Sequence, residues 1–142
     1  MLEWNDVFIT DHKTVDVQHE KLFEMINNFE TSLLNGTAEA SINETLQFLG
    51  NYVVAHFTHE EKEMANSNCP AAEENKKQHA AFLEAYGKYV ERFKTEGYSA
   101  MLAYELLRTA QNWIVDHICG TDVNLRSYPS QVPHAPDAKE NG

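Results

Sequence analysis

The chain has 142 residues, of which 22 are acidic and 11 are basic, and its net charge is −11. A surface this acidic repels nucleic acid and anionic lipid, so we expect neither as a partner. The length fits one domain, and no apolar run reaches the roughly 18 residues that would span a membrane. The first residues have neither the basic nor the apolar stretch of a signal peptide, so we expect a cytoplasmic protein.

Four segments carry apolar residues three and four positions apart, which is the pattern of helices that bury one face. We expect the first to end at Gly36 and the third at Gly97, because glycine commonly follows the last helical turn. Ser41 and Glu44 have the spacing of a capping box and predict the start of the second helix. The predicted helices span residues 15–34, 41–64, 71–96 and 99–120.

The connections between these helices are short, which favours antiparallel neighbours. No segment shows the period-two alternation of a strand. We therefore predict an all-α protein, an up-down-up-down four-helix bundle over residues 1–126. Residues 127–142 contain three prolines among small polar residues and predict a flexible tail.

Histidines and a glutamate recur at particular ends of the predicted helices. The first helix carries His19 near its start, and the second carries His56 and Glu60 near its end. The third carries His79 near its start, and the fourth carries His117 near its end. In an up-down-up-down bundle, a start, an end, a start and an end lie at the same pole. Side chains spread over about a hundred residues of sequence should therefore meet.

Some of these ionisable side chains face inward, because His56 and Glu60 are one turn apart and continue an apolar stripe. One inward histidine is most simply a hydrogen-bonded core residue. Four histidines with two carboxylates predict a metal site, since buried ionisable groups are costly unless paired or metal-bound. The second carboxylate, Asp122, can return to the cluster if the chain leaves the helix after His117, and Gly120 gives the backbone that freedom.

Imidazole and carboxylate ligands without thiolate suit iron, manganese or, less specifically, zinc. Cys69 and Cys119 lack the paired spacing of a zinc–thiolate site. Six protein ligands exceed what one metal with an open position needs. Two metal ions bridged by Glu60 and Asp122 would use them all.

Four groups of residues in this chain are similar, in order and approximate spacing, to the motifs of one family. They are Asp16-x-Gln18-His19, His56-Phe57-x-x-Glu60-Glu61, His79-x-x-Phe82 and Trp113-x-x-x-His117-Ile118-x-x-x-Asp122. On these residues the chain resembles the bacterial branch of the hemerythrin family, over roughly residues 3–126. The resemblance implies a non-haem di-iron centre that binds O2 reversibly.

The resemblance also implies a role for each ligand. His19 and His56 would hold one iron, which keeps a vacant position for O2. His79 and His117 would hold the second iron. The two carboxylates and a solvent-derived oxo or hydroxo group would bridge the two ions. The apolar residues near the ligands would line an O2 pocket, although ordinary bundle core explains them equally well: Leu22, Phe23, Phe57, Phe82, Trp113, Ile114 and Ile118.

The match departs from the family at one ligand. The family usually has a fifth histidine one turn before His79, where this chain has Asn75. An amide oxygen is a weak, neutral ligand compared with imidazole. The second iron would then be completed by water or be bound less tightly. An alternative pair, His59 and Glu63, is also one turn apart and would be used if the second helix were rotated.

The leading functional prediction is a small O2-binding protein for storage, delivery or sensing, not an enzyme. One alternative is a di-iron peroxidase or oxidase, or an enzyme that reacts with nitric oxide, which the vacancy at Asn75 would favour. The other is an iron-binding bundle without oxygen chemistry, which an apolar pocket disfavours. No protein partner is indicated.

Overall fold

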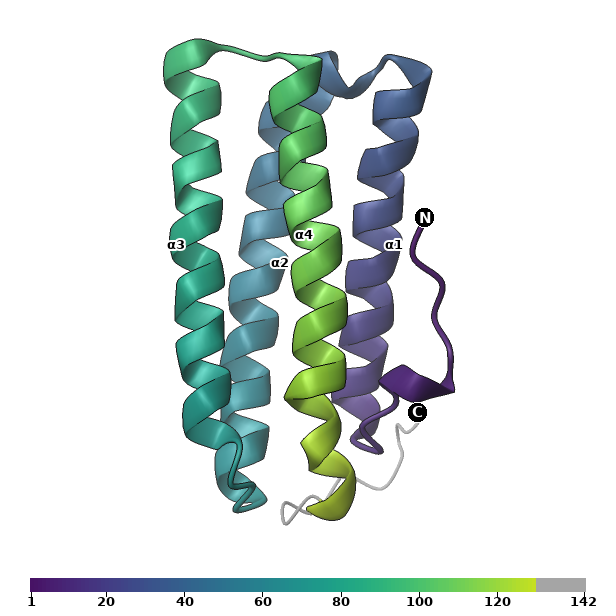
Figure 1. The fold of residues 1–142 in the computed structure, drawn as a ribbon, viewed down its shortest axis with the longest axis vertical. Coiled ribbons are helices and arrows are strands. Elements are labelled where there is room, and N and C mark those ends of the chain that lie inside the picture. Colours follow the sequence, from purple (N-terminus) through teal and green to yellow (C-terminus); the bar gives the residue numbers. More distant parts are fainter. Residues whose placement is uncertain (130–142) are drawn as a thin grey trace.

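A computed structural model describes residues 1–129, which form four long helices and two short 3-10 helices (Figure 1). There is no strand in this part of the chain, and the predicted all-α class is confirmed. In chain order the elements are η1 (Asp6–Phe8), α1 (Lys13–Asn35), α2 (Ala38–Asn66), α3 (Ala72–Glu96), α4 (Ala100–Gly120) and η2 (Asp122–Ser127).

The helices alternate in direction, as the short connections predicted. In Figure 1, α1 and α3 run upward while α2 and α4 run downward. The starts of α1 and α3 and the ends of α2 and α4 therefore lie together, at what we call the lower pole. Helix α1 packs against both α2 and α4, and α3 packs against α2 and α4, which closes the four-helix bundle.

The helix ends follow local backbone chemistry, with one exception. Gly36 and Gly97 follow α1 and α3 with φ values of 76° and 82°, which glycine adopts at little cost. Both predicted ends are confirmed. Helix α2, however, begins at Ala38, one turn before the predicted capping box. The sharp turn at Gly36 lets the helix restart at once, and the hydroxyl of Ser41 donates to the carbonyl of Thr37 instead of capping.

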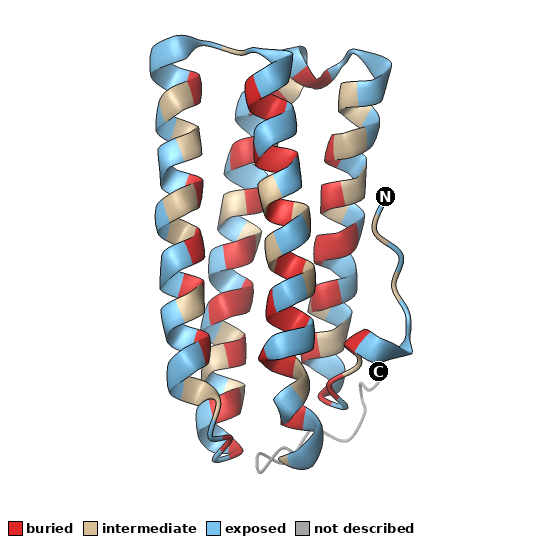
Figure 2. Ribbon diagram, in the orientation of Figure 1, coloured by how far each residue is buried: buried red, intermediate tan, exposed pale blue. Residues whose placement is uncertain are grey.

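Buried residues form a stripe along the inner side of each helix (Figure 2). Over most of the bundle these stripes are apolar, and each fully buried Leu, Ile or Phe side chain stabilises the fold by about 1.5–3 kcal/mol. At the lower pole the same stripes carry histidine, glutamate and asparagine. The periodicity that builds the core therefore also turns these polar side chains inward.

The N-terminal segment and η2 close the lower pole by two sets of contacts, which we call the terminal clasp. The guanidinium of Arg126 donates to the backbone carbonyls of Asp6, Val7 and Ile9. His12 is buried, with Nδ1 2.8 Å from a carboxylate oxygen of Glu63 and Nε2 2.8 Å from the carbonyl oxygen of Tyr128. The clasp ties both ends of the described chain to α2.

The predicted tail falls mostly outside this description. Residue 127 ends η2 and residues 128–129 follow it, whereas residues 130–142 lie outside the described residues. No helix within residues 1–129 has the length and apolar character needed to cross a membrane.

Candidate metal centre

The six predicted ligands meet at the lower pole. They come from all four helices and from η2, and none is more than 3% exposed. They are His19 on α1, His56 and Glu60 on α2, His79 on α3, His117 on α4 and Asp122 at the start of η2. Potential ligand atoms of His19, His56 and Glu60 lie within 4.8 Å of one another, and so do those of Glu60, His79, His117 and Asp122.

The first of these groups, which we call the α1/α2 half, is arranged around one oxygen of each carboxylate. His19 Nε2 lies 3.0 Å from Glu60 Oε2 and 3.2 Å from Asp122 Oδ2. His56 Nε2 lies 3.6 Å from the same Glu60 Oε2. Two imidazole nitrogens and two carboxylate oxygens thus converge on one small volume.

The second group, the α3/α4 half, uses the other oxygen of each carboxylate. His79 Nε2 lies 3.0 Å from Glu60 Oε1. His117 Nε2 lies 3.1 Å from Asp122 Oδ1 and 3.9 Å from Glu60 Oε1. Each carboxylate therefore presents one oxygen to each pair of imidazoles, which is the arrangement that two bridged cations require.

Hydrogen bonds at Nδ1 set the tautomers of the histidines. His56 Nδ1 is 2.7 Å from the side-chain oxygen of Gln18, and His79 Nδ1 is 2.9 Å from a carboxylate oxygen of Glu61. These oxygens accept, so Nδ1 carries the hydrogen and Nε2 turns a lone pair toward the cluster. A second hydrogen-bonded partner of this kind typically orients a metal-binding imidazole.

The third oriented imidazole is linked to the turn that carries the aspartate. The side-chain oxygen of Gln78 accepts from His117 Nδ1 and, at 3.0 Å, from the hydroxyl of Thr121. The chain leaves α4 at Thr121 and enters η2, which brings Asp122 back to the cluster as predicted. The exit does not use a glycine-only conformation, because Gly120 has no positive φ.

The cluster has the charge and lone pairs of a cation site. All four oxygens of Glu60 and Asp122 are buried, and their near polar neighbours among the described residues are the imidazole nitrogens of the cluster. His79 Nε2 and His117 Nε2 face each other at 3.1 Å, and with hydrogen on both Nδ1 atoms their lone pairs repel unless a cation or proton lies between them. Buried groups of this kind are costly alone, so the residues present fit metal ions.

Without metal, protons are held where cations would be. Burial opposes a charge on His19 and His117, but Asp122 and Glu60 outweigh it and raise the pKa of His19 to about 10 and of His117 to about 9. Burial lowers the pKa of His56 to about 3. The nearby imidazoles hold the pKa of Glu60 well below its usual range despite burial, and burial with the Glu60 charge raises that of Asp122. His19 in the α1/α2 half and His117 in the α3/α4 half are therefore protonated at neutral pH.

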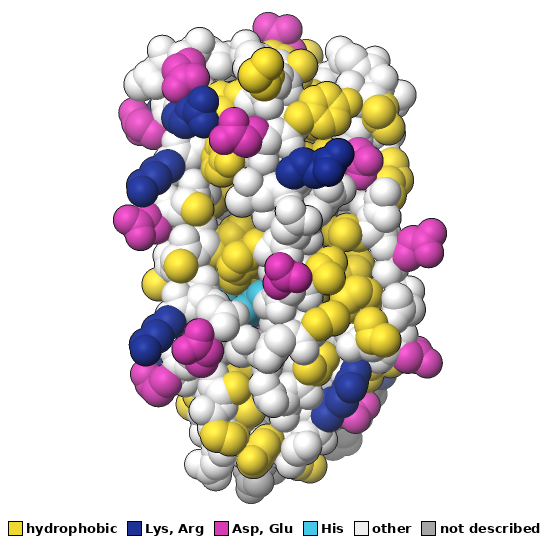
Figure 3. Space-filling view, in the orientation of Figure 1, with side chains coloured by type: hydrophobic (Ala, Val, Ile, Leu, Met, Phe, Trp, Pro, Cys, Tyr) yellow, Lys and Arg dark blue, Asp and Glu magenta, His cyan; other side chains and the backbone are white. Residues whose placement is uncertain are grey.

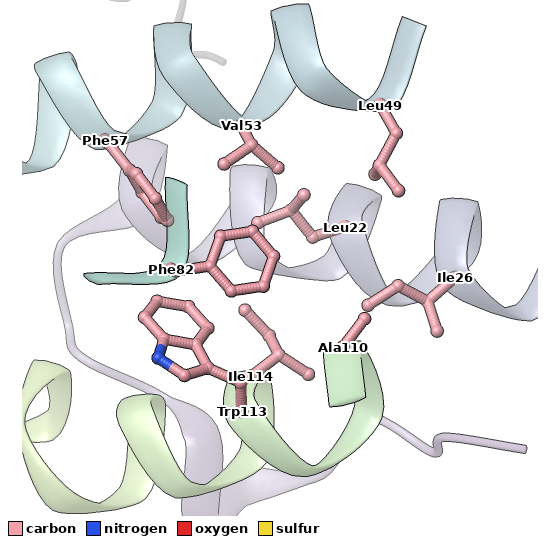
Figure 4. A pocket seen from close by; sticks show the side chains of 9 residues that line it. All are labelled: Leu22, Ile26, Leu49, Val53, Phe57, Phe82, Ala110, Trp113 and Ile114. Carbon is pink, nitrogen blue, oxygen red and sulfur yellow. The ribbon is translucent and has the colours of Figure 1, made fainter. Parts of the chain in front are cut away.

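An apolar cavity of about 20 Å³ lies next to the cluster, in the bundle interior (Figure 4). Five predicted pocket residues line it, namely Leu22, Phe57, Phe82, Trp113 and Ile114. Phe23 and Ile118 are buried but do not line it, and Phe23 packs against Trp4 and Phe8 instead. Four further lining residues, which were not predicted as pocket residues, follow the same stripes away from the cluster: Ile26, Leu49, Val53 and Ala110.

Two aromatic walls of this cavity also pack on ligand histidines. The Phe57 ring stacks on His79 at a centroid distance of 3.7 Å and an interplanar angle of 3°. The Trp113 ring stacks on His117 at 4.3 Å and 13°. The same two aromatic rings therefore line the cavity and hold the imidazoles in place.

Two other positions singled out by the sequence lie differently. Asn75, one turn before His79 on α3, is fully buried, and neither its Oδ1 nor its Nδ2 has a hydrogen-bond partner among the described residues. His59 is only partly buried, and Glu63 pairs with His12. The structure thus brings His56 and Glu60 to the cluster, not the alternative pair on α2.

Comparison with known proteins gives a consistent result. Residues 10–125 match the sequence profile of the hemerythrin HHE cation binding domain. Over 124 residues the chain is 28% identical to a myohemerythrin of Theromyzon tessulatum, covering 87% of this chain and 90% of that protein. It is 26% identical to a bacteriohemerythrin of Stenotrophomonas maltophilia over 132 residues, or 93% and 82% of the two chains. With hemerythrin subunit alpha of Lingula reevii it shares 29% over 123 residues, or 87% and 91%.

Proposed function

This chain belongs to the hemerythrin family of di-iron, O2-binding proteins, and from that premise we propose that it binds O2 reversibly at two irons, for storage, delivery or sensing. One observation carries the proposal. Glu60 and Asp122 each direct one oxygen toward the His19/His56 pair and the other toward His79 or His117. A site for a single cation would not need this doubled arrangement.

Each half of the cluster would hold one iron. His19 and His56 would bind the first, and His79 and His117 the second, with a solvent-derived oxo or hydroxo group between the ions. The bound irons would supply the electrons by which O2 is held. The α1/α2 half would keep the vacant position for O2, as the resemblance to the family implies.

The polypeptide would hold the imidazoles in position and keep water away from the bound oxygen. Gln18, Glu61 and Gln78 hold three imidazoles with Nε2 toward the cluster, so little reorganisation is needed when iron binds. The apolar cavity of about 20 Å³ next to the cluster excludes water and has room for one small molecule. Water exclusion limits hydrolysis and loss of bound oxygen, which makes reversible binding possible.

The alternatives from the sequence are weaker. Hemerythrins bind oxygen and are not enzymes, so a peroxidase or oxidase role has less support than O2 binding. An iron store without oxygen chemistry would have no use for the dry cavity beside the cluster. A cytoplasmic location stays a prediction of the sequence.

The test is an iron assay combined with an anaerobic-to-aerobic optical titration. We expect two irons per chain when iron is in excess, and an absorption band that appears with O2, disappears under vacuum and returns. Metal-free protein, treated in the same way, is the control. A protein that takes up one iron or none, or whose spectrum changes irreversibly with O2, would contradict the proposal.

A further inference from the structure

Asn75 is a buried polar side chain on the ligand-bearing face of α3, and the proposed ligand set leaves it unused. It lies one turn before His79, on the same face of α3, and is 0% exposed. Its carbonyl oxygen and its amide nitrogen both lack a partner among residues 1–129. A buried amide without partners is costly, so something other than residues 1–129 must satisfy it.

A bound metal can satisfy only part of this side chain. The amide oxygen has lone pairs that a cation could accept, but the two N–H groups can only donate. They need an acceptor, and none is provided by the neighbouring side chains. The unpaired donors therefore point to a small group with a lone pair beside the metal.

The side chain also leaves room for such a group. The amide atoms of Asn75 are two bonds beyond Cβ, whereas the Nε2 atom of a histidine is three bonds beyond Cβ. A histidine at this position would reach farther toward the metal of the α3/α4 half. With asparagine, the amide would stop one bond short, and this would leave a coordination position beside it.

We propose that the metal of the α3/α4 half has an open position beside Asn75, which takes one small monodentate ligand, a water molecule or a small anion, hydrogen-bonded to the Asn75 amide. The inference rests on the proposed function, because it needs a second metal ion. It adds a ligand position distinct from the O2 position in the α1/α2 half.

The surroundings limit what can enter. Asn75, His79 and Asp122 are at most 1% exposed, so there is no space for a large ligand. Over α3 and α4 the surface shows only a small part of one histidine between other side chains (Figure 3). A ligand of one to three atoms that arrives from this side or through the interior fits these limits, and azide is a suitable probe.

The experiment is an azide titration of the di-ferric protein, followed by optical and infrared spectroscopy. We expect two azides per chain, one for each half, with two separate infrared bands. Asn75→His should lose one azide and one band, because imidazole fills the open position. Asn28→His, the same substitution at an exposed position of α1, should keep both.

A second variant separates the amide's role from folding and size. Asn75→Asp has the same shape but replaces the N–H donors with a negative charge, so we expect at least tenfold weaker azide binding at this position only. If the protein holds two irons but binds a single azide, or if Asn75→Asp leaves both affinities unchanged, the inference is wrong. If fewer than two irons bind, it is the proposed function that fails.

Discussion

The two halves of the metal centre have the same number of imidazoles but differ in what stands behind them. In the α1/α2 half, His56 is oriented by the neutral amide of Gln18, and His19 Nδ1 is buried without a hydrogen-bond partner in the described chain. In the α3/α4 half, both imidazoles are oriented, and that of His79 is oriented by the carboxylate of Glu61. The two halves therefore have the same number of imidazole ligands but different hydrogen-bond partners at the Nδ1 atoms.

The stronger orienting group belongs to the half with the weaker ligand set. A carboxylate at Nδ1 makes an imidazole a more basic and stronger ligand than an amide does. The half that has Asn75 in place of a further imidazole is also the half with Glu61. We infer that Glu61 partly compensates the α3/α4 half for its weaker ligand set.

Replacing a shared carboxylate should weaken metal binding in both halves and should have the largest effect. Glu60→Gln replaces one carboxylate oxygen by an amide nitrogen, which cannot bind a cation, and removes the negative charge that both halves share. Changes behind the ligands typically cost about 10–100-fold in metal affinity, so we expect a loss of more than about 100-fold for each ion. An iron assay after dialysis measures it, with the exposed Glu44→Gln on the same helix as control. Retention of one full iron per chain would show that Glu60 does not serve both halves.

The stability of the metal-free protein should depend on pH through one histidine of each half, and we expect this effect to be the second largest. His19 and His117 have folded-state pKa values of about 10 and 9, above the ordinary value of 6.5. Their contribution to stability is complete below pH 6.5 and is lost as the pH rises through 9 to 10. We expect the urea concentration at the unfolding midpoint of the metal-free protein to fall between pH 6.5 and pH 10. This fall should be smaller in His19→Gln and in His117→Gln. A flat profile up to pH 10 would contradict the raised pKa values.

Exchanging the groups behind the imidazoles should affect one half at a time. Glu61→Gln should weaken metal binding in the α3/α4 half by about 10–100-fold and leave the α1/α2 half nearly unchanged. Gln18→Glu should strengthen the α1/α2 half and remove the difference that Glu61 makes between the halves. Stepwise titration with Co²⁺, followed optically, measures both affinities. Equal weakening of the two sites in Glu61→Gln would show that Glu61 does not act through His79 alone.

Loosening the terminal clasp should have the smallest effect, shared by both halves. Arg126→Ala removes hydrogen bonds to three backbone carbonyls and frees η2, which carries Asp122. Because these bonds are exposed, we expect a loss of about 1–2 kcal/mol in unfolding free energy and a several-fold weaker hold on both metals. Thermal unfolding and iron content measure it, with the exposed Arg108→Ala as control. A change in only one half would show that η2 positions more than the shared aspartate.

Much of the fold was predictable because it depends on local patterns. The spacing of apolar residues indicated four helices, and Gly36 and Gly97 ended two of them where positive φ is needed. The start of α2 was wrong, because Ser41 and Glu44 have a capping-box spacing although the turn at Gly36 allows the helix to begin earlier. Capping patterns describe what a helix start tolerates, whereas the preceding turn decides where it begins.

The sequence by itself determined which side chains could meet at the lower pole. Alternating helix directions bring His19, His56, His79 and His117 together, and the four-residue repeat puts Glu60 beside His56. The packing of the helices, by contrast, selects which side chain orients which ligand histidine. Gln18 and Gln78 each precede a ligand histidine in the sequence, yet each accepts from a histidine on another helix. Helical periodicity defines a direction around one axis, but the rotation and offset between helices come from packing the whole core.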